Sequence, residues 1–73
     1  MKLIVNGVHV THAGSVISYR EVVGLSGLRG NPTVTYTSKR DDNNARREGS
    51  MYDGQSISVE PEMRFAVTHT NNA

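Results

Sequence analysis

The Asn6-Gly7 dipeptide constrains the fold of this chain more than any other short stretch, because it lies between two runs of β-branched residues. Both residues accept the positive φ that a type I′ turn requires, so the sequence predicts a β-hairpin with a two-residue turn. On the return strand we expect Val8 and Val10 to face the core and His9 to lie on the opposite side.

A helix is predicted after this hairpin. Ser18 and Glu21 match the S-x-x-E pattern of a capping box, in which each side chain satisfies a backbone amide at the start of a helix. Either Gly27 or Gly30 can end the helix in the left-handed conformation, which predicts a helix of about ten residues. An apolar stripe at helical spacing lies between these limits: Tyr19, Val22, Val23 and Ser26.

Further strands are predicted in the second half of the chain. Residues 33–37 follow a proline and alternate threonine with larger side chains, which is typical of a half-buried strand. The polar stretch 39–50 predicts a surface loop, and residues 51–52 a short strand. Residues 63–68 form the last predicted strand, in which every second side chain faces the core.

In chain order the elements are two strands, a helix, a strand, a loop, a short strand and a final strand. They predict an α+β domain in which one helix packs across a mixed sheet of four to five strands. We expect the domain to occupy residues 1–68 and residues 69–73 to form a flexible C-terminal tail. The expected core consists of apolar side chains from all of these elements: Leu3, Val5, Val8, Val10, Ile17, Val22, Val23, Val34, Tyr36, Ile57, Val59, Phe65 and Val67.

Composition argues against several classes of function. The chain has 73 residues and no cysteine, which excludes disulfides, thiolate nucleophiles and cysteine-type zinc sites. Its formal net charge of +1 gives no support for binding to nucleic acid or to an acidic membrane surface. No apolar run approaches the roughly 18 residues of a membrane span, and the N-terminal run is too short for a secretion signal. We therefore expect a soluble, cytoplasmic protein.

Side chains suited to catalysis are not grouped along the sequence. His9 and His12 are expected on opposite faces of a strand, His69 lies in the tail, and no acidic residue is close enough in sequence to complete a metal site. The serines have no neighbouring general base. Gly24, Gly27 and Gly30 lie at the end of the predicted helix, whereas a phosphate-binding loop has its glycines at the start of a helix. We expect no enzyme, no metal and no bound cofactor.

The stretch from Ile17 to Leu28, ISYREVVGLSGL, is the most distinctive part of the chain. Together with the Asn-Gly hairpin before it and Ile57, Val59 and Phe65 after it, this stretch resembles bacterial ubiquitin-like proteins, including the multiubiquitin-type domains. The element order is similar to that of the β-grasp, the ubiquitin fold. The resemblance covers nearly the whole chain.

The resemblance implies that the chain is a protein modifier. In such systems an E1-like enzyme adenylates the C-terminal carboxylate with ATP, and an E2-like enzyme passes the acyl group to a target protein. An isopeptidase or processing peptidase is a further expected partner, encoded with the other two in a bacterial ubiquitination-like operon whose expected role is antiphage defence. ATP serves the activating enzyme, so the modifier itself needs no cofactor.

The modifier hypothesis depends on the C-terminal tail, which consists of His69, Thr70, Asn71, Asn72 and Ala73. Ubiquitin and the sulfur carriers end in Gly-Gly, because glycine is slim and accepts the backbone angles that enzyme channels require. No glycine follows Gly54 in this chain. Either the cognate enzymes accept an end without glycine, or a peptidase trims the tail first.

A second candidate surface is the outward face of the expected sheet, with Lys2, Ile4, Arg64, Ala66 and Thr68. Only Ile4 and Ala66 are apolar, so proteins that bind the apolar patch of ubiquitin should bind this face poorly. The surface belongs to an alternative hypothesis, in which the chain is a β-grasp binding module that is never conjugated. A sulfur carrier is the third hypothesis, and the missing glycines weaken it most.

Overall fold

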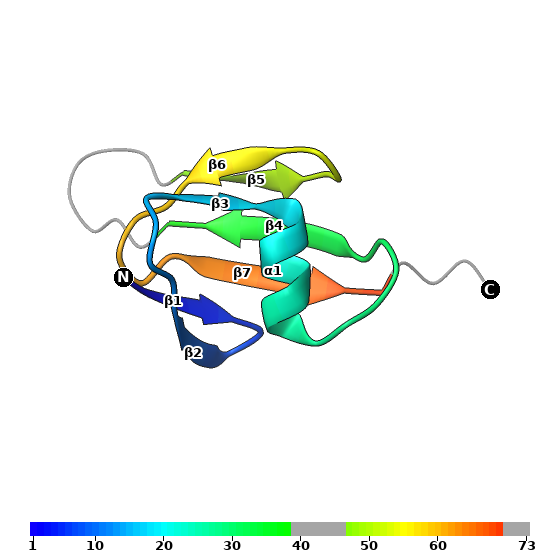
Figure 1. Cartoon of the computed structure of the whole chain (residues 1–73), viewed down its shortest axis with the longest axis horizontal. Coiled ribbons are helices and arrows are strands. Elements are labelled where there is room, and N and C mark those ends of the chain that lie inside the picture. Colours follow the sequence, from blue (N-terminus) through cyan, green and yellow to red (C-terminus); the bar gives the residue numbers. More distant parts are fainter. Residues whose placement is uncertain (39–46, 70–73) are drawn as a thin grey trace.

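The computed structural model describes residues 1–38 and 47–69 of the chain. Its elements are β1 (Lys2–Val5), β2 (Val8–Thr11), β3 (Val16–Ser18), α1 (Tyr19–Ser26), β4 (Thr33–Thr37), β5 (Glu48–Met51), β6 (Ser56–Ser58) and β7 (Arg64–Thr68). Five strands form one sheet in the order β2-β1-β7-β4-β5, and β3 pairs with β6 in a separate sheet. β1 and β7 are parallel, and the other pairs are antiparallel. α1 packs across one face of the larger sheet (Figure 1), which confirms the predicted α+β, β-grasp fold.

The N-terminal hairpin forms as the Asn-Gly dipeptide predicts. Asn6 and Gly7 have φ values of +52° and +82°, the left-handed pair that a type I′ turn requires. Val8 pairs with Val5 across this turn, yet its predicted core position is wrong, because Val8 is 62% exposed. β2 is an edge strand, and α1 packs on β1, β4 and β7 nearer the middle of the sheet. Val8 therefore lies beyond the area that the helix covers.

The helix begins with the predicted capping box. The Ser18 Oγ accepts a hydrogen bond from the Glu21 amide at 3.1 Å, and the Glu21 Oε1 accepts one from the Ser18 amide at 2.9 Å. Gly27 ends the helix with a φ of +81°, so α1 has eight residues rather than about ten. In the described part of the chain, no helix is long and apolar enough to cross a membrane.

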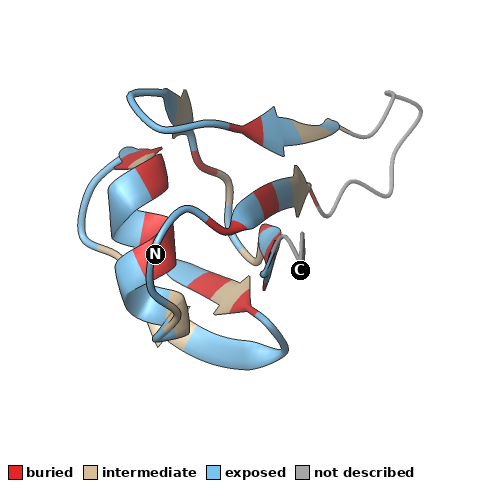
Figure 2. Cartoon of the chain, turned by 90° about the vertical axis from the view of Figure 1, so that its right-hand side faces the viewer, coloured by how far each residue is buried: buried red, intermediate tan, exposed pale blue. Residues whose placement is uncertain are grey.

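The hydrophobic core lies between α1 and the inner face of the five-stranded sheet, where the buried residues in Figure 2 face one another. Apart from Val8, the predicted core residues are buried or pack against the core as partly buried side chains. Tyr19, on the predicted apolar stripe, and Met63, predicted to point inward from the last strand, are buried as well. Met51 is also buried, although the predicted core does not include it. In β7, Phe65 and Val67 point inward while Ala66 points outward, as their alternation predicts.

The small sheet of β3 and β6 is absent from the sequence prediction. Each strand has only three residues, and Ile17 and Ile57 pair at its centre. So short a pattern does not distinguish a strand from a loop.

The prediction of a loop over 39–50 is wrong for Glu48–Ser50, because these residues belong to β5 and pair with β4. The predicted short strand at 51–52 is wrong for Tyr52, since β5 ends at Met51 and Tyr52 is exposed.

The glycine in β5, Gly49, has a packing role. A Cβ at Gly49 would lie 2.9 Å from the hydroxyl oxygen of Tyr36, its cross-strand partner.

The connection between β4 and β5 is fixed at its base. The Ser38 amide donates to the Arg47 carbonyl at 2.8 Å, and the Arg47 amide donates to the Ser38 Oγ at 2.9 Å. The Arg47 guanidinium, expected to be solvated in a loop, forms an ion pair with Glu60 at 2.9 Å. Residues 39–46, which hold the charged side chains of the predicted loop other than Arg47 and Glu48, lie outside the described residues.

Candidate functional site

β7, the strand that leads into the predicted tail, lies in the middle of the five-stranded sheet between β1 and β4. Its last residue, Thr68, pairs with Thr33 at the start of β4. His69 is exposed, and residues 70–73 of the predicted tail lie outside the described residues. The sheet therefore holds the chain as far as Thr68.

The side chain of Asn6 extends the pairing between β1 and β7 toward the tail. Backbone hydrogen bonds join Ile4 to Met63 at 3.0 Å and Asn6 to Phe65 at 2.9 Å. The next bonds come from the Asn6 side chain: its Oδ1 accepts from the Val67 amide at 2.8 Å and its Nδ2 donates to the Val67 carbonyl at 3.1 Å. β1 has already turned away at this point, so the Asn6 amide group takes the place of a strand backbone. We call this pair of bonds the Asn6 clamp.

The sequence hypothesis for the outward sheet surface placed Lys2, Ile4, Arg64, Ala66 and Thr68 together, and the structure brings them onto neighbouring strands. Ile4 pairs with Arg64 across β1 and β7, and Arg64 pairs with Thr37 of β4. The five side chains are exposed except for Ile4, which is partly buried. We call the side of the sheet that faces away from α1 the outer sheet face.

The outer sheet face is polar. The register places His9, Ile4, Arg64, Thr37 and Glu48 in one row across the five strands. Glu48 is missing from the sequence hypothesis because β5 is not a predicted strand at that position. This face therefore has no broad apolar centre among the described residues, in contrast to the patch that ubiquitin presents.

A polar cluster joins three segments at the end of the sheet where β7 stops. Arg20, at the start of α1, donates to both carboxylate oxygens of Asp53 at 3.2 and 2.9 Å, and to the Oδ1 of Asn31 at 2.8 Å. Its hydrogen bonds raise the pKa of the Arg20 guanidinium, and they lower the pKa of the Asp53 carboxyl. Both side chains are more than half exposed, at 55% and 56%, so the pair fixes geometry more than it adds stability.

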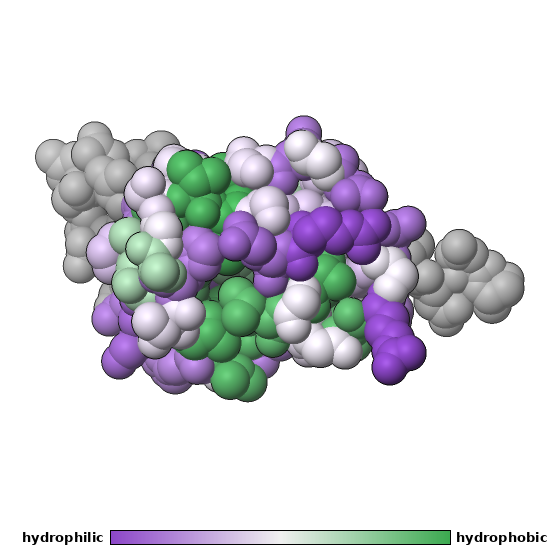
Figure 3. Space-filling model, in the orientation of Figure 1, coloured by the Kyte–Doolittle hydropathy of each residue, from purple (hydrophilic) through white to green (hydrophobic). Residues whose placement is uncertain are grey.

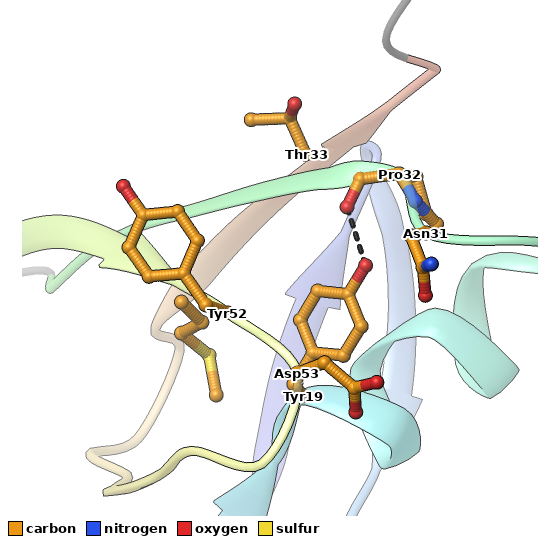
Figure 4. A pocket seen from close by; sticks show the side chains of 7 residues that line it. Tyr19, Asn31, Pro32, Thr33, Tyr52 and Asp53 are labelled. Atoms are coloured by element: carbon orange, nitrogen blue, oxygen red, sulfur yellow. Dashed lines mark hydrogen bonds between the residues drawn. The ribbon is translucent and has the colours of Figure 1, made fainter.

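A pocket of about 370 Å³ opens beside this cluster (Figure 4). Its apolar lining comes from Tyr19, Pro32, Met51 and Tyr52, and its polar lining from Asn31, Thr33 and Asp53. The Tyr19 hydroxyl donates a buried hydrogen bond of 2.6 Å to the Pro32 carbonyl. Figure 4 shows Thr33 close to the end of β7, so the pocket borders the point where the tail begins. Sequence reasoning missed this pocket, because its lining comes from three separate segments of the chain.

The exposed large hydrophobic residues come from separate parts of the chain. Among the described residues they are Met1, Val8, Val16, Leu25 and Tyr52. On the helix side of the molecule, hydrophobic surface gathers in separate areas divided by hydrophilic bands (Figure 3).

The described histidines and acidic residues show no cluster of metal-ligand type. No group of three or more His, Asp or Glu side chains in residues 1–38 and 47–69 is placed to hold a metal ion. The His12 Nε2 instead lies 2.8 Å from the Val16 carbonyl, as a hydrogen-bonded loop side chain.

A comparison with families of known proteins agrees with this architecture. The family model described as Multiubiquitin matches residues 1–71, which is nearly the full chain. Searches of curated proteins and of solved structures found no match. The extent of the family match, together with the β-grasp order of the strands, identifies this chain as a member of the Multiubiquitin family.

Proposed function

We propose that this chain is a ubiquitin-like protein modifier whose C-terminal carboxylate is activated and transferred to target proteins. One structural observation supports this proposal above the others: the Asn6 clamp and the Thr33–Thr68 pair hold β7 up to the residue before the tail. The globular domain thus presents the following residues from a rigid base. The membership of the Multiubiquitin family supports the same function.

The proposed chemistry takes place at the tail, and the enzymes supply the catalytic groups. A carboxylate oxygen of the tail attacks the α-phosphorus of ATP on an E1-like enzyme, and pyrophosphate leaves. A nucleophilic side chain of the enzyme then displaces AMP from the acyl carbon. An E2-like enzyme receives the acyl group, and an amine of the target finally displaces the enzyme. The modifier contributes its shape and its carboxylate.

The proposal includes a bacterial operon as its setting, with an isopeptidase or processing peptidase beside the two transfer enzymes, and antiphage defence in the cytoplasm as its role. Two forms of the substrate are compatible with the sequence. The activating enzyme either accepts Ala73 as the terminal residue, or acts after a peptidase has exposed an earlier one such as Asn72.

A second candidate function is a β-grasp binding module that is never conjugated. One observation favours it: no glycine follows Gly54, whereas the channels of ubiquitin-type enzymes favour glycine. In this case the outer sheet face would be the docking surface. Its row of threonines with Arg64 and Glu48 suits a polar partner rather than a reader of the ubiquitin patch.

Coexpression with the neighbouring genes separates the two candidates. The intact mass of the purified chain should show trimming, an adenylate or a heavier adduct on a target, and deletion of residues 69–73 should abolish every adduct. A chain that keeps its mass in the presence of all its neighbours contradicts the modifier proposal. A deletion variant that still binds its partner supports the docking module.

A further inference from the structure

The pocket described above lies where an activating enzyme must approach the domain. Thr33 lines the pocket and is the cross-strand partner of Thr68. Paired Cα atoms in an antiparallel ladder are about 4.5–5.5 Å apart, so the pocket mouth borders the last residue of β7. The five residues from 69 to 73 span at most about 18 Å when fully extended. An enzyme that holds the tail carboxylate in its active site therefore faces this end of the sheet.

Hydrogen bonds already hold the walls of the pocket together without a partner. The Arg20 guanidinium ties the β5–β6 turn to the loop before β4 through Asp53 and Asn31, and its cationic carbon lies 5.5 Å from the centre of the Tyr19 ring. The turn is closed by the Gln55 amide, which donates to the Tyr52 carbonyl at 2.9 Å. A preformed site costs little ordering entropy when a ligand enters.

The chemistry of the lining favours an apolar occupant. The Tyr19 hydroxyl, the Asn31 Oδ1 and the Asp53 carboxylate already bond to the backbone or to Arg20. Tyr52 is 65% exposed at the mouth, and Pro32 and Met51 supply buried apolar walls. Exposed aromatic side chains beside an apolar pocket are typical anchors of protein interfaces. None of the residues named above for the outer sheet face is an exposed large hydrophobic side chain.

We propose that this pocket is the anchor site for the E1-like activating enzyme and accepts one large apolar side chain, such as leucine, methionine or phenylalanine, from the enzyme surface. Binding there places the start of the tail at the enzyme and leaves open the part of the outer sheet face around Arg64, at the other end of β7. The proposal rests on the proposed function for the identity of the enzyme, and on the pocket itself for the mode of docking.

The test compares two truncations of equally exposed side chains in the full-length chain. Tyr52→Ala removes the aromatic wall, whereas the control Val8→Ala removes apolar surface from β2, at the opposite edge of the sheet; the two side chains are 65% and 62% exposed. Urea unfolding of each variant establishes that the fold is retained. Titration with the E1-like enzyme from the neighbouring gene gives the Kd, and ATP–pyrophosphate exchange gives the KM for the modifier.

We expect Tyr52→Ala to raise both the Kd and the KM by about tenfold or more, and Val8→Ala to change each by less than about twofold. Tyr52→Glu, which places a charge at the mouth, should weaken binding further. If ATP–pyrophosphate exchange has the same KM for the wild-type chain and for both Tyr52 variants, the anchor site is overturned and the modifier function is left intact. Binding that is lost in Tyr52→Ala, without any ATP–pyrophosphate exchange by the wild-type chain in either its full or its trimmed form, supports the anchor site and refutes the modifier function. An enzyme that neither binds nor activates the wild-type chain refutes both.

Discussion

Replacement of Asn6 should loosen the C-terminal end of β7, because its side chain makes the last two hydrogen bonds between β1 and β7. Each net hydrogen bond contributes about 0.5–1.5 kcal/mol, so loss of the clamp should cost about 1–3 kcal/mol. Asn6 also has a φ of +52°, a conformation that costs a residue such as alanine about 1–2 kcal/mol. We therefore expect Asn6→Ala to lower the free energy of unfolding by about 2–5 kcal/mol.

The variant Asn6→Gly separates the two contributions, because glycine accepts the positive φ but has no side-chain amide. Its free energy of unfolding should lie about 1 kcal/mol above that of Asn6→Ala and still below that of wild type. Urea denaturation at equilibrium measures these differences.

Hydrogen exchange locates the effect along the chain. The Val67 amide donates to the Asn6 Oδ1, whereas the Ile4 amide donates to the Met63 carbonyl in the same ladder. In both Asn6 variants Val67 should exchange faster relative to Ile4, because only Val67 loses its acceptor. Unfolding free energies within about 0.5 kcal/mol of wild type for both variants, or an unchanged ratio of the two exchange rates, would refute the clamp.

Four further substitutions, one of them a control, test the packing and the polar cluster. Phe65→Ala, at a core position, should lower the free energy of unfolding by about 3–5 kcal/mol, and a variant with the melting temperature of wild type would contradict the core assignment. Gly49→Ala should destabilise by about 1–3 kcal/mol, because its Cβ would meet the Tyr36 hydroxyl at 2.9 Å. Gly24→Ala is its control: apart from its chain neighbours and the backbone of its own helix, no atom lies within 4 Å of the added Cβ, and helix propensity predicts a gain of about 1 kcal/mol in the free energy of unfolding, measured by urea denaturation. For Asp53, hydrogen bonding to Arg20 lowers the folded pKa below 3.8, so its stabilising effect is present above that pH and disappears as the pH falls through the folded value. The difference in urea midpoint between wild type and Asp53→Asn should therefore shrink in acid, and a difference that grows there would contradict the ion pair.

Local patterns in the sequence predict a large part of the fold. The Asn-Gly turn, the capping box at Ser18 and the alternation in β7 each depend on residues close together in the chain, and all three are confirmed. β3 and β6 escape prediction because each is stabilised by its partner rather than by its own three residues. β5 escapes because Glu48, Gly49 and Ser50 have low strand propensity, and pairing with β4 overrides it.

The error at Val8 has a different physical origin. Alternation along a strand predicts which side of the sheet a residue faces, and Val8 does share a side with Val5. It does not predict how far the helix extends over that side. The eight residues of α1 cover the central strands, and Val8 is left at the edge.

The candidate site is only partly predictable. The outward residues of β1 and β7 follow from alternation, and the register then brings Ile4 beside Arg64. The Asn6 clamp joins residues 61 positions apart. The pocket likewise combines Tyr19, Pro32 and Tyr52 from separate segments of the chain. No local pattern contains such contacts, so they emerge only from the fold.

The central claim is that the tail carboxylate is the group on which the activating enzyme acts, and ATP–pyrophosphate exchange tests it most directly. The E1-like enzyme from the neighbouring gene is incubated with labelled pyrophosphate, ATP and either the full chain or residues 1–68. The account predicts exchange that depends on the full chain and is absent with residues 1–68, although the shorter chain still binds the enzyme through its pocket. Equal exchange with the full chain and with residues 1–68 would contradict the claim. So would the absence of exchange both with the full chain and with a chain trimmed by the processing peptidase.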